Sequence, residues 1–270
     1  MNNPQSADND ISSDHSSSSS SNNNQTADTQ ANPMSFIEHL SELRKRLIRM
    51  LVTIIVCFIP LMFFSQEIYT FVATPVFNVL PQNASMIATE VTSTFFAPFK
   101  LTFFVALALS APMILHQIWA FISPGLYLHE RQVAIPLLLS SVVLFYLGIA
   151  FAYYVVFPIL LTFFAAASPE GVAFMPDIQE YLNVALKLFL AFGAAFEIPV
   201  ALMLLIWSGV VTAQDIKSKR PYIIVICFVI AMLMTPPDIF SQTLLAVPMW
   251  MLFELGLFMS RWIQPKSARL

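Results

Sequence analysis

The sequence predicts an all-α membrane protein with six kinked transmembrane helices in a concave bundle and both termini on the cytoplasmic side. Composition is the first observation, because 57% of the 270 residues are hydrophobic and only 11% are charged, whereas soluble domains carry about 25% charged residues. The second observation is a series of long apolar runs. The third is a one-sided distribution of Lys and Arg.

Six apolar runs account for the predicted helices. A helix needs about 20 apolar residues to cross a hydrocarbon core of about 30 Å. Four runs are clear candidates, at about 47–66, 97–120, 134–157 and 182–207, and two more follow at about 222–235 and 239–260. Because Pro221 and Pro236-Pro237 bracket the fifth run, we expect helices 5 and 6 to be short for an ordinary bilayer. Prolines in or beside most runs predict kinks and hence a concave bundle.

The basic residues predict the orientation of the chain. Lys100 and Lys187 lie in or at the edge of apolar runs, and every other Lys and Arg lies in segments that six spans place on one side. The segments on the opposite side contain several acidic residues but no basic ones. Positively charged segments stay on the cytoplasmic face during insertion. We therefore expect both termini to be cytoplasmic.

Three parts are predicted along the chain. Residues 1–34 are rich in Ser and Asn, acidic, and free of Lys, Arg and aromatic residues, which indicates a disordered tail. Residues 35–262 form the six-helix domain and 263–270 a short cytoplasmic tail. The S-x-x-E pattern of Ser35 and Glu38 is typical of a capping box, so we expect the first helix to begin at Ser35.

Two carboxylates stand out for different reasons. Glu197 lies near the middle of the fourth run, where an ionised side chain costs about 3 kcal/mol, so it is expected to be functional. Glu42 and Arg46 are spaced i, i+4 before the first run, and this spacing alone favours an ordinary helical ion pair. The sequence contains no nucleotide-binding, nucleophile or zinc-ligand motif. We therefore expect no catalytic residue, metal, cofactor or nucleic acid.

Several motifs together resemble those of the TatC family, the membrane component of the Sec-independent twin-arginine protein translocase. The matching stretches lie in family order across about residues 36–262. They are His39–Leu47, Met86–Thr89, Trp119–Tyr127, His129–Arg131, Phe196–Pro199, Lys219–Tyr222, Thr235–Asp238 and Phe240–Thr243.

This resemblance implies a receptor rather than an enzyme. TatC proteins bind the twin-arginine signal peptides of folded proteins and export these proteins with the small partners TatA and TatB, using the proton-motive force. The implied location is the bacterial cytoplasmic (inner) membrane, where the chain would contact the lipid bilayer and other copies of itself.

The resemblance also implies roles for individual positions. Four positions match those that bind the signal peptide: Glu42, Glu130, Arg44 and Phe121. Four match intramembrane or outer-side positions at which the family is sensitive to change: Glu197, Pro75, Tyr153 and Asp238. Four match the face that meets partner helices: Met232, Leu233, Thr235 and Gln242.

Two other classes of protein compete with the receptor. A proton-coupled secondary transporter or channel is suggested by Glu197, Glu254 and Lys187 within the apolar runs. The inverted repeats of many such transporters are not visible in the sequence. A membrane anchor for a respiratory enzyme would carry cofactor ligands, and His116 is the only histidine in an apolar run. The receptor is the favoured interpretation.

Overall fold

The computed structural model describes residues 33–79, 85–122, 131–169, 174–207, 209, 211–235 and 238–260. The chain falls into two units, Met1–Ser41 and Glu42–Leu270. The described residues of the first unit form the start of a helix, and the packing of helices against one another concerns the second unit. The predicted acidic tail, the predicted cytoplasmic tail and Glu130 lie outside the described residues, except for Pro33 and Met34.

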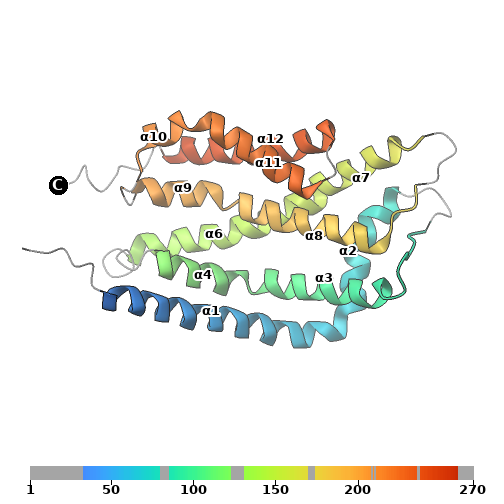
Figure 1. The fold of residues 1–270 in the computed structure, drawn as a ribbon, viewed down its shortest axis with the longest axis horizontal. Helices are drawn as coiled ribbons and strands as arrows, with labels where there is room; N and C mark the ends of the chain where they lie inside the picture. The colour runs from blue at the N-terminus through green and yellow to red at the C-terminus, as the bar shows by residue number, and fades with distance from the viewer. Residues whose placement is uncertain are drawn as a thin grey trace, which may run out of the picture. The chain divides into compact units, whose positions relative to one another are not determined.

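Within these ranges the regular structure is helical, apart from one bridge between Ile87 and Asp177. The helices, shown in Figure 1, are α1 (Pro33–Leu61), α2 (Ser65–Val79), α3 (Ser93–Leu109), α4 (Ala111–Ile122), α6 (Arg131–Phe151), α7 (Phe157–Ala166), α8 (Ile178–Ala195), α9 (Ile198–Trp207), α10 (Ala213–Ser218), α11 (Arg220–Met234) and α12 (Ile239–Met259). A 3₁₀ turn, η1 (Met62–Phe64), joins α1 to α2, and a π-helical turn, η2 (Ala152–Val156), joins α6 to α7. The predicted all-α class is confirmed.

The apolar helices are long enough to span a membrane in most cases. Among the described residues, four stretches meet the length and composition of a span: Leu40–Asn78, Ile135–Ala166, Ile178–Trp207 and Ile239–Met259. The helices α3 and α4 meet at a bend of 53° and give a fifth candidate. The 15 residues of α11 are short, as expected. The 21 residues of α12 are enough for a full span, so the short length expected of helix 6 was wrong.

Several helices extend beyond the apolar runs that predicted them. The helix α1 begins at Pro33 rather than Ser35, because proline suits the first turn, where its missing N–H would have no helical acceptor. After α1 and the turn η1, helical structure resumes in α2 and continues to Val79. The polar residues Ser65, Gln66 and Glu67, at and just beyond the end of the apolar run, form the first turn of α2. An apolar run marks the lipid-embedded part of a helix, and not the end of its hydrogen bonding.

Prolines produce the kinks that were predicted. Pro199 leaves the carbonyl of Ala195 without a helical donor, and the chain breaks between α8 and α9 at Phe196 and Glu197. Pro158 likewise follows the π-helical turn η2. Both irregularities place a polar side chain, Glu197 or Tyr153, where the regular α-helix is interrupted.

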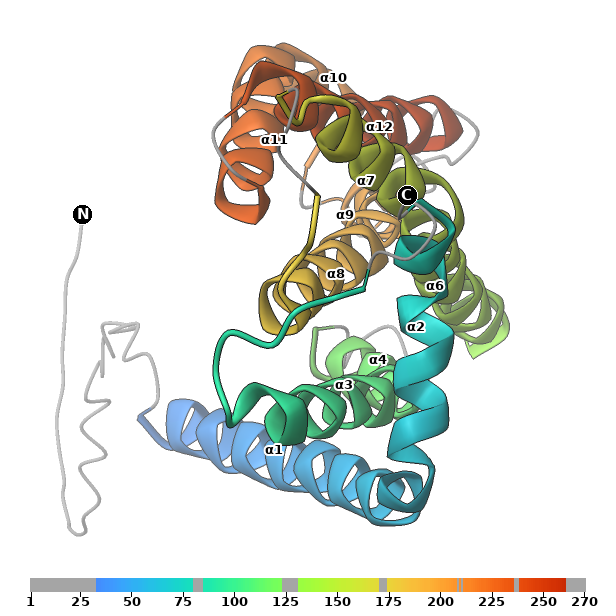
Figure 2. The ribbon, with the colours of Figure 1, turned by 90° about the vertical axis from the view of Figure 1, so that its right-hand side faces the viewer.

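The helix α8 is the centre of the second unit. Within an apolar window of 18 residues, 56% of residues are buried in α8 and α9, against 6% in α1 and α2. Figures 1 and 2 show α8 with α6 and α3 as neighbours, and α12 lies against α9 and α11. Gly148 of α6 allows the close crossing with α8, because a Cβ there would lie 2.5 Å from the carbonyl oxygen of Phe192. Small residues commonly permit such approaches in membrane helices.

Candidate functional site

The carboxylate of Glu42 is held by Arg46 one helical turn later on α1. The Arg46 Nε donates to Glu42 Oε1 at 3.0 Å, and its Nη2 contacts the same oxygen. The predicted i, i+4 ion pair is therefore confirmed. The side chain of Arg46 is 16% exposed whereas that of Glu42 is 42% exposed. The carboxylate thus stays accessible while its cationic neighbour is mostly enclosed.

Arg46 also joins α1 to the end of α4. Its Nη1 donates to Oε1 of the buried Gln117 at 3.3 Å, and its Nη2 donates to the carbonyl oxygen of Ala120 at 3.2 Å. Phe121, the next residue, lies in the last turn of α4 and is half-buried. Arg46 thereby connects Glu42 on α1 to the backbone of α4 at the residue before Phe121.

The other two residues of the predicted signal-peptide site are Arg44 and Glu130, and the structure describes only the first. Arg44 is exposed on α1. Glu130 lies outside the described residues. The geometry at Glu42 is suited to guanidinium ligands, since a carboxylate accepts several charge-assisted hydrogen bonds from such a group. Arg46 already makes contacts of this kind there.

Pro75 and Tyr153, predicted as separate sensitive positions, act on the same backbone group. Pro75 has no N–H to donate to the carbonyl of Phe71 four residues earlier in α2. The hydroxyl of Tyr153 donates to that oxygen at 2.8 Å, and its ring stacks on Phe71 with centroids 5.1 Å apart. The buried Tyr181 of α8 donates to the next carbonyl, that of Val72, at 2.7 Å. Two tyrosines from different elements therefore donate to neighbouring backbone carbonyls of α2.

Glu197 belongs to a second polar cluster, between α8, α6 and α4. Its Oε2 accepts a hydrogen bond from the buried Ser141 of α6, and Nε1 of Trp119 donates to the same hydroxyl at 3.4 Å. Its Oε1 is buried and has no hydrogen-bond donor among the described residues. The carboxylate borders a cavity of about 490 Å³ whose other walls are almost entirely apolar, including Phe145 and Leu190.

The partner-helix residues are placed unequally. Met232 and Leu233 are 48% and 64% exposed on α11. Thr235 is buried, and its hydroxyl donates to the carbonyl oxygen of Ala231. Gln242 on α12 is half-buried, while Asp238 caps α12 by accepting from the N–H of Ser241 at 2.7 Å. The exposed surface thus includes Met232 and Leu233, and not Thr235.

Sequence reasoning did not find the groups that support these residues. Gln117 and Ser141 carry no spacing signal, because their partners lie 71 and 56 residues away. Asp177, one of the acidic residues in the segments opposite the basic ones, carries no spacing signal either. Its Oδ2 accepts from the N–H and hydroxyl of Thr89 at 2.9 and 2.7 Å, while Oδ1 caps α8. These hydrogen bonds lower the pKa of Asp177 to about 2.

Long apolar helices and polar groups enclosed between them define a multi-pass helical membrane protein. A family model described as "Sec-independent protein translocase protein (TatC)" matches residues 38–248. The chain belongs to the TatC family and is a component of the twin-arginine protein translocase.

Individual relatives agree with this membership. The TatC protein of Azotobacter chroococcum mcd 1 is 56% identical over 225 residues, which cover 83% of this chain and 88% of the relative. That of Escherichia coli K12 is 55% identical over 231 residues, covering 86% and 90%. A crystal structure described as the twin arginine translocase receptor TatC superimposes with a TM-score of 0.75 at 35% identity. It covers 83% of this chain and 99% of that one.

Proposed function

We propose that this chain is the signal-peptide receptor and core subunit of a twin-arginine translocase. It would bind twin-arginine signal peptides of folded proteins and export these proteins across the bacterial inner membrane, using the proton-motive force. Both termini would be cytoplasmic, in line with the distribution of Lys and Arg. The description of the solved relative as a receptor supports this role.

The accessible carboxylate of Glu42 is the observation that carries the proposal. Arg46 links this carboxylate to the carbonyl of Ala120, next to Phe121. The segments on the proposed cytoplasmic side are mostly basic and repel a cationic peptide at long range. Recognition therefore depends on local carboxylates that accept hydrogen bonds from guanidinium groups. Glu42 supplies one, and we infer that Glu130 supplies a second.

The proposed partners are the small proteins TatA and TatB and further copies of this chain. The exposed Met232 and Leu233 of the short helix α11 provide an apolar surface for a partner helix. A helix of 15 residues is about 22 Å long, about 8 Å less than the hydrocarbon core. A partner helix packed there, or a locally thinner bilayer, relieves that mismatch.

Photo-crosslinking in membrane vesicles tests the receptor role. A twin-arginine signal peptide carrying a photoreactive residue beside its arginines is mixed with vesicles containing the wild type, Glu42→Ala or Glu130→Ala. Both variants should lose the crosslink and stop export of a folded substrate, while remaining in the membrane at wild-type abundance. A peptide with two lysines in place of the arginines should behave like the variants.

Asp215→Asn is the matched control. Asp215 lies on the same proposed face, and its side chain accepts from the N–H of Thr212 in the capping box of α10, which the amide oxygen of Asn can also do. This control should crosslink like the wild type. Undiminished crosslinking of the twin-arginine peptide to both Glu42→Ala and Glu130→Ala would count decisively against the proposal.

A further inference from the structure

Lys100 lies in α3 where a lysine is unexpected. It follows the start of the helix by seven residues, a depth of about 10 Å along the axis. Its ammonium group donates to Oδ1 of Asn183 on α8. Within the described ranges Lys100 forms no ion pair, and this leaves two of its three N–H donors without a partner. An ammonium group near hydrocarbon without a counter-ion is unfavourable.

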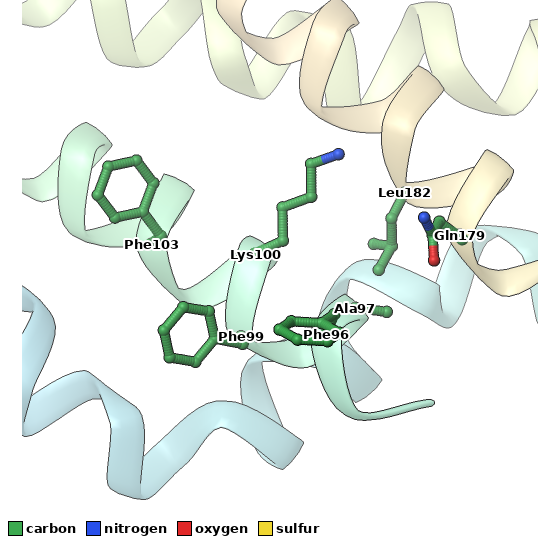
Figure 3. A pocket seen from close by; sticks show the side chains of 7 residues that line it. All are labelled: Phe96, Ala97, Phe99, Lys100, Phe103, Gln179 and Leu182. Carbon is green, nitrogen blue, oxygen red and sulfur yellow. The ribbon is translucent and has the colours of Figure 1, made fainter. Parts of the chain in front are cut away.

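A cavity of about 310 Å³ opens beside this lysine. Figure 3 shows Lys100 reaching from α3 toward α8, with Leu182 and Gln179 at the far wall and phenylalanine rings along α3. Phe96, Phe99 and Phe103 are 55%, 38% and 47% exposed. The cavity thus presents one cationic group above an apolar, aromatic surface.

Contacts of α3 and the segment before it with α8 and α1 hold Lys100 and the phenylalanine rings in place. Asp177, immediately before α8, binds Thr89 in the segment that leads into α3. The Ile87 and Asp177 segments also exchange backbone hydrogen bonds, of 3.2 and 2.9 Å. The ring of Phe58 on α1 meets those of Phe99 and Phe103 edge to face, with centroids 5.1 and 5.8 Å apart. The lysine and its aromatic surface are held by contacts independent of any ligand.

We propose that this cavity binds an anionic phospholipid, with the headgroup phosphate on Lys100 and an acyl chain over Phe99 and Phe103. The lipid belongs to the leaflet beside the 85–92 and 174–177 segments, which is the outer leaflet in the predicted orientation. Charge complementarity selects an anionic headgroup, since no carboxylate of the described residues pairs with the lysine. The apolar walls select a lipid over free phosphate. A lysine near a membrane surface contributes about 1 kcal/mol to attraction of anionic lipid.

Native mass spectrometry of the purified full chain in detergent micelles tests the site. Phosphatidylglycerol and phosphatidylcholine with identical acyl chains are titrated separately. The wild type should bind phosphatidylglycerol more tightly. Lys100→Gln should weaken that binding about fivefold, the equivalent of about 1 kcal/mol, and leave phosphatidylcholine binding unchanged. Lys100→Arg should keep the preference, and inorganic phosphate at the lipid's concentration should not displace the lipid.

Lys187→Gln is the matched control, because Lys187 is an exposed lysine of α8 that borders a different cavity, beside α11. It should bind both lipids like the wild type. If Lys100→Gln does not fold, Asn183→Asp gives the same test, because a carboxylate against the ammonium group competes with the phosphate. The proposal would be overturned if Lys100→Gln or Asn183→Asp kept the wild-type preference for phosphatidylglycerol. It would also be overturned if Lys100→Arg lost as much affinity for phosphatidylglycerol as Lys100→Gln, or if inorganic phosphate displaced the lipid.

Discussion

Tyr153 donates its hydroxyl hydrogen to the carbonyl oxygen of Phe71, the acceptor that Pro75 leaves without a helical donor. The proline and the tyrosine are 78 residues apart in sequence. The proline removes the helical donor for this carbonyl, and the tyrosine supplies another. A backbone carbonyl that lacks a donor is costly where water cannot reach it. Tyr153 supplies the missing hydrogen bond from the π-helical turn η2.

The first prediction is that Pro75 and Tyr153 are energetically coupled. Tyr153→Phe should lower the free energy of unfolding by about 1 kcal/mol in the wild type. It should cost much less in a Pro75→Ala background, because the introduced alanine can donate its own N–H to the carbonyl of Phe71. Thermal unfolding in detergent of the two single variants and the double variant measures the coupling.

Tyr154→Phe is the control, since no hydrogen bond of its hydroxyl occurs among the described residues. Strictly additive effects would disprove the coupling.

The second prediction concerns Arg46. Arg46→Gln removes the hydrogen bonds that join Glu42 to Gln117 and Ala120. Loss of charge-assisted bonds worth about 1.5 kcal/mol should weaken signal-peptide binding about tenfold, measured by titration of a fluorescent twin-arginine peptide. Arg49→Gln, three residues later and exposed, should bind like the wild type. Tighter peptide binding in Arg46→Gln would mean that Arg46 competes with the peptide instead of positioning Glu42.

Ser141 is the subject of the third prediction. Ser141→Ala leaves Oε2 of Glu197 without the donor seen in the structure, so the variant should lose about 1 kcal/mol of stability and export more slowly. Ser140→Ala provides the comparison, because that hydroxyl bonds only to the Leu137 carbonyl of its own helix. Glu197→Leu should abolish export. Normal export rates in Ser141→Ala and Glu197→Leu would show that the cluster is dispensable.

The fourth prediction is a pH dependence set by Asp177. Hydrogen bonds from Thr89 hold its folded-state pKa at about 2, below the ordinary value of 3.8. A lowered folded-state pKa stabilises the protein above the unfolded value, and this stability is lost as pH falls toward the folded value. The difference in Tm between wild type and Asp177→Asn should therefore be constant above about pH 5 and shrink between about pH 4 and 2. For Glu67→Gln, an exposed carboxylate of α2, the difference should stay near zero throughout. A wild-type advantage that persists unchanged to pH 2 would contradict the assignment.

The sequence predicted the helical class because apolar runs and charge distribution are local properties of the chain. It also predicted the pair of Glu42 and Arg46, since helical spacing alone brings them together. It did not predict that Arg46 reaches Ala120 or that Ser141 reaches Glu197, because those contacts depend on how separate helices pack. The motif match identified Pro75 and Tyr153 individually, and only the packing revealed that they meet at Phe71.

The length of α12 shows a related limit. The prolines that bracket the fifth run suggested that both final helices were short. The helix instead extends for 21 residues from the cap at Asp238, through the polar Ser241 and Gln242. The backbone N–H and C=O groups of polar residues form the same helical hydrogen bonds as those of apolar residues. The expectation of a short helix 6 failed because it was carried over from the prolines around helix 5, whereas the sixth apolar run, at about 239–260, matches α12 closely.

The π-helical turn at Ala152–Val156 is equivalent to one extra residue inserted into a continuous helix. Each residue of an α-helix turns the chain by about 100°. A π-helical turn holds its extra residue by turning the chain less at each residue, so its total rotation is nearly that of an α-helix with one residue fewer. The helix α7 therefore leaves the turn with almost the face that an uninterrupted helix would present, and Phe157 and Leu160 remain completely buried. The extra residue is absorbed within the turn, where it alters the backbone around Tyr153 without changing which residues of α7 pack inward.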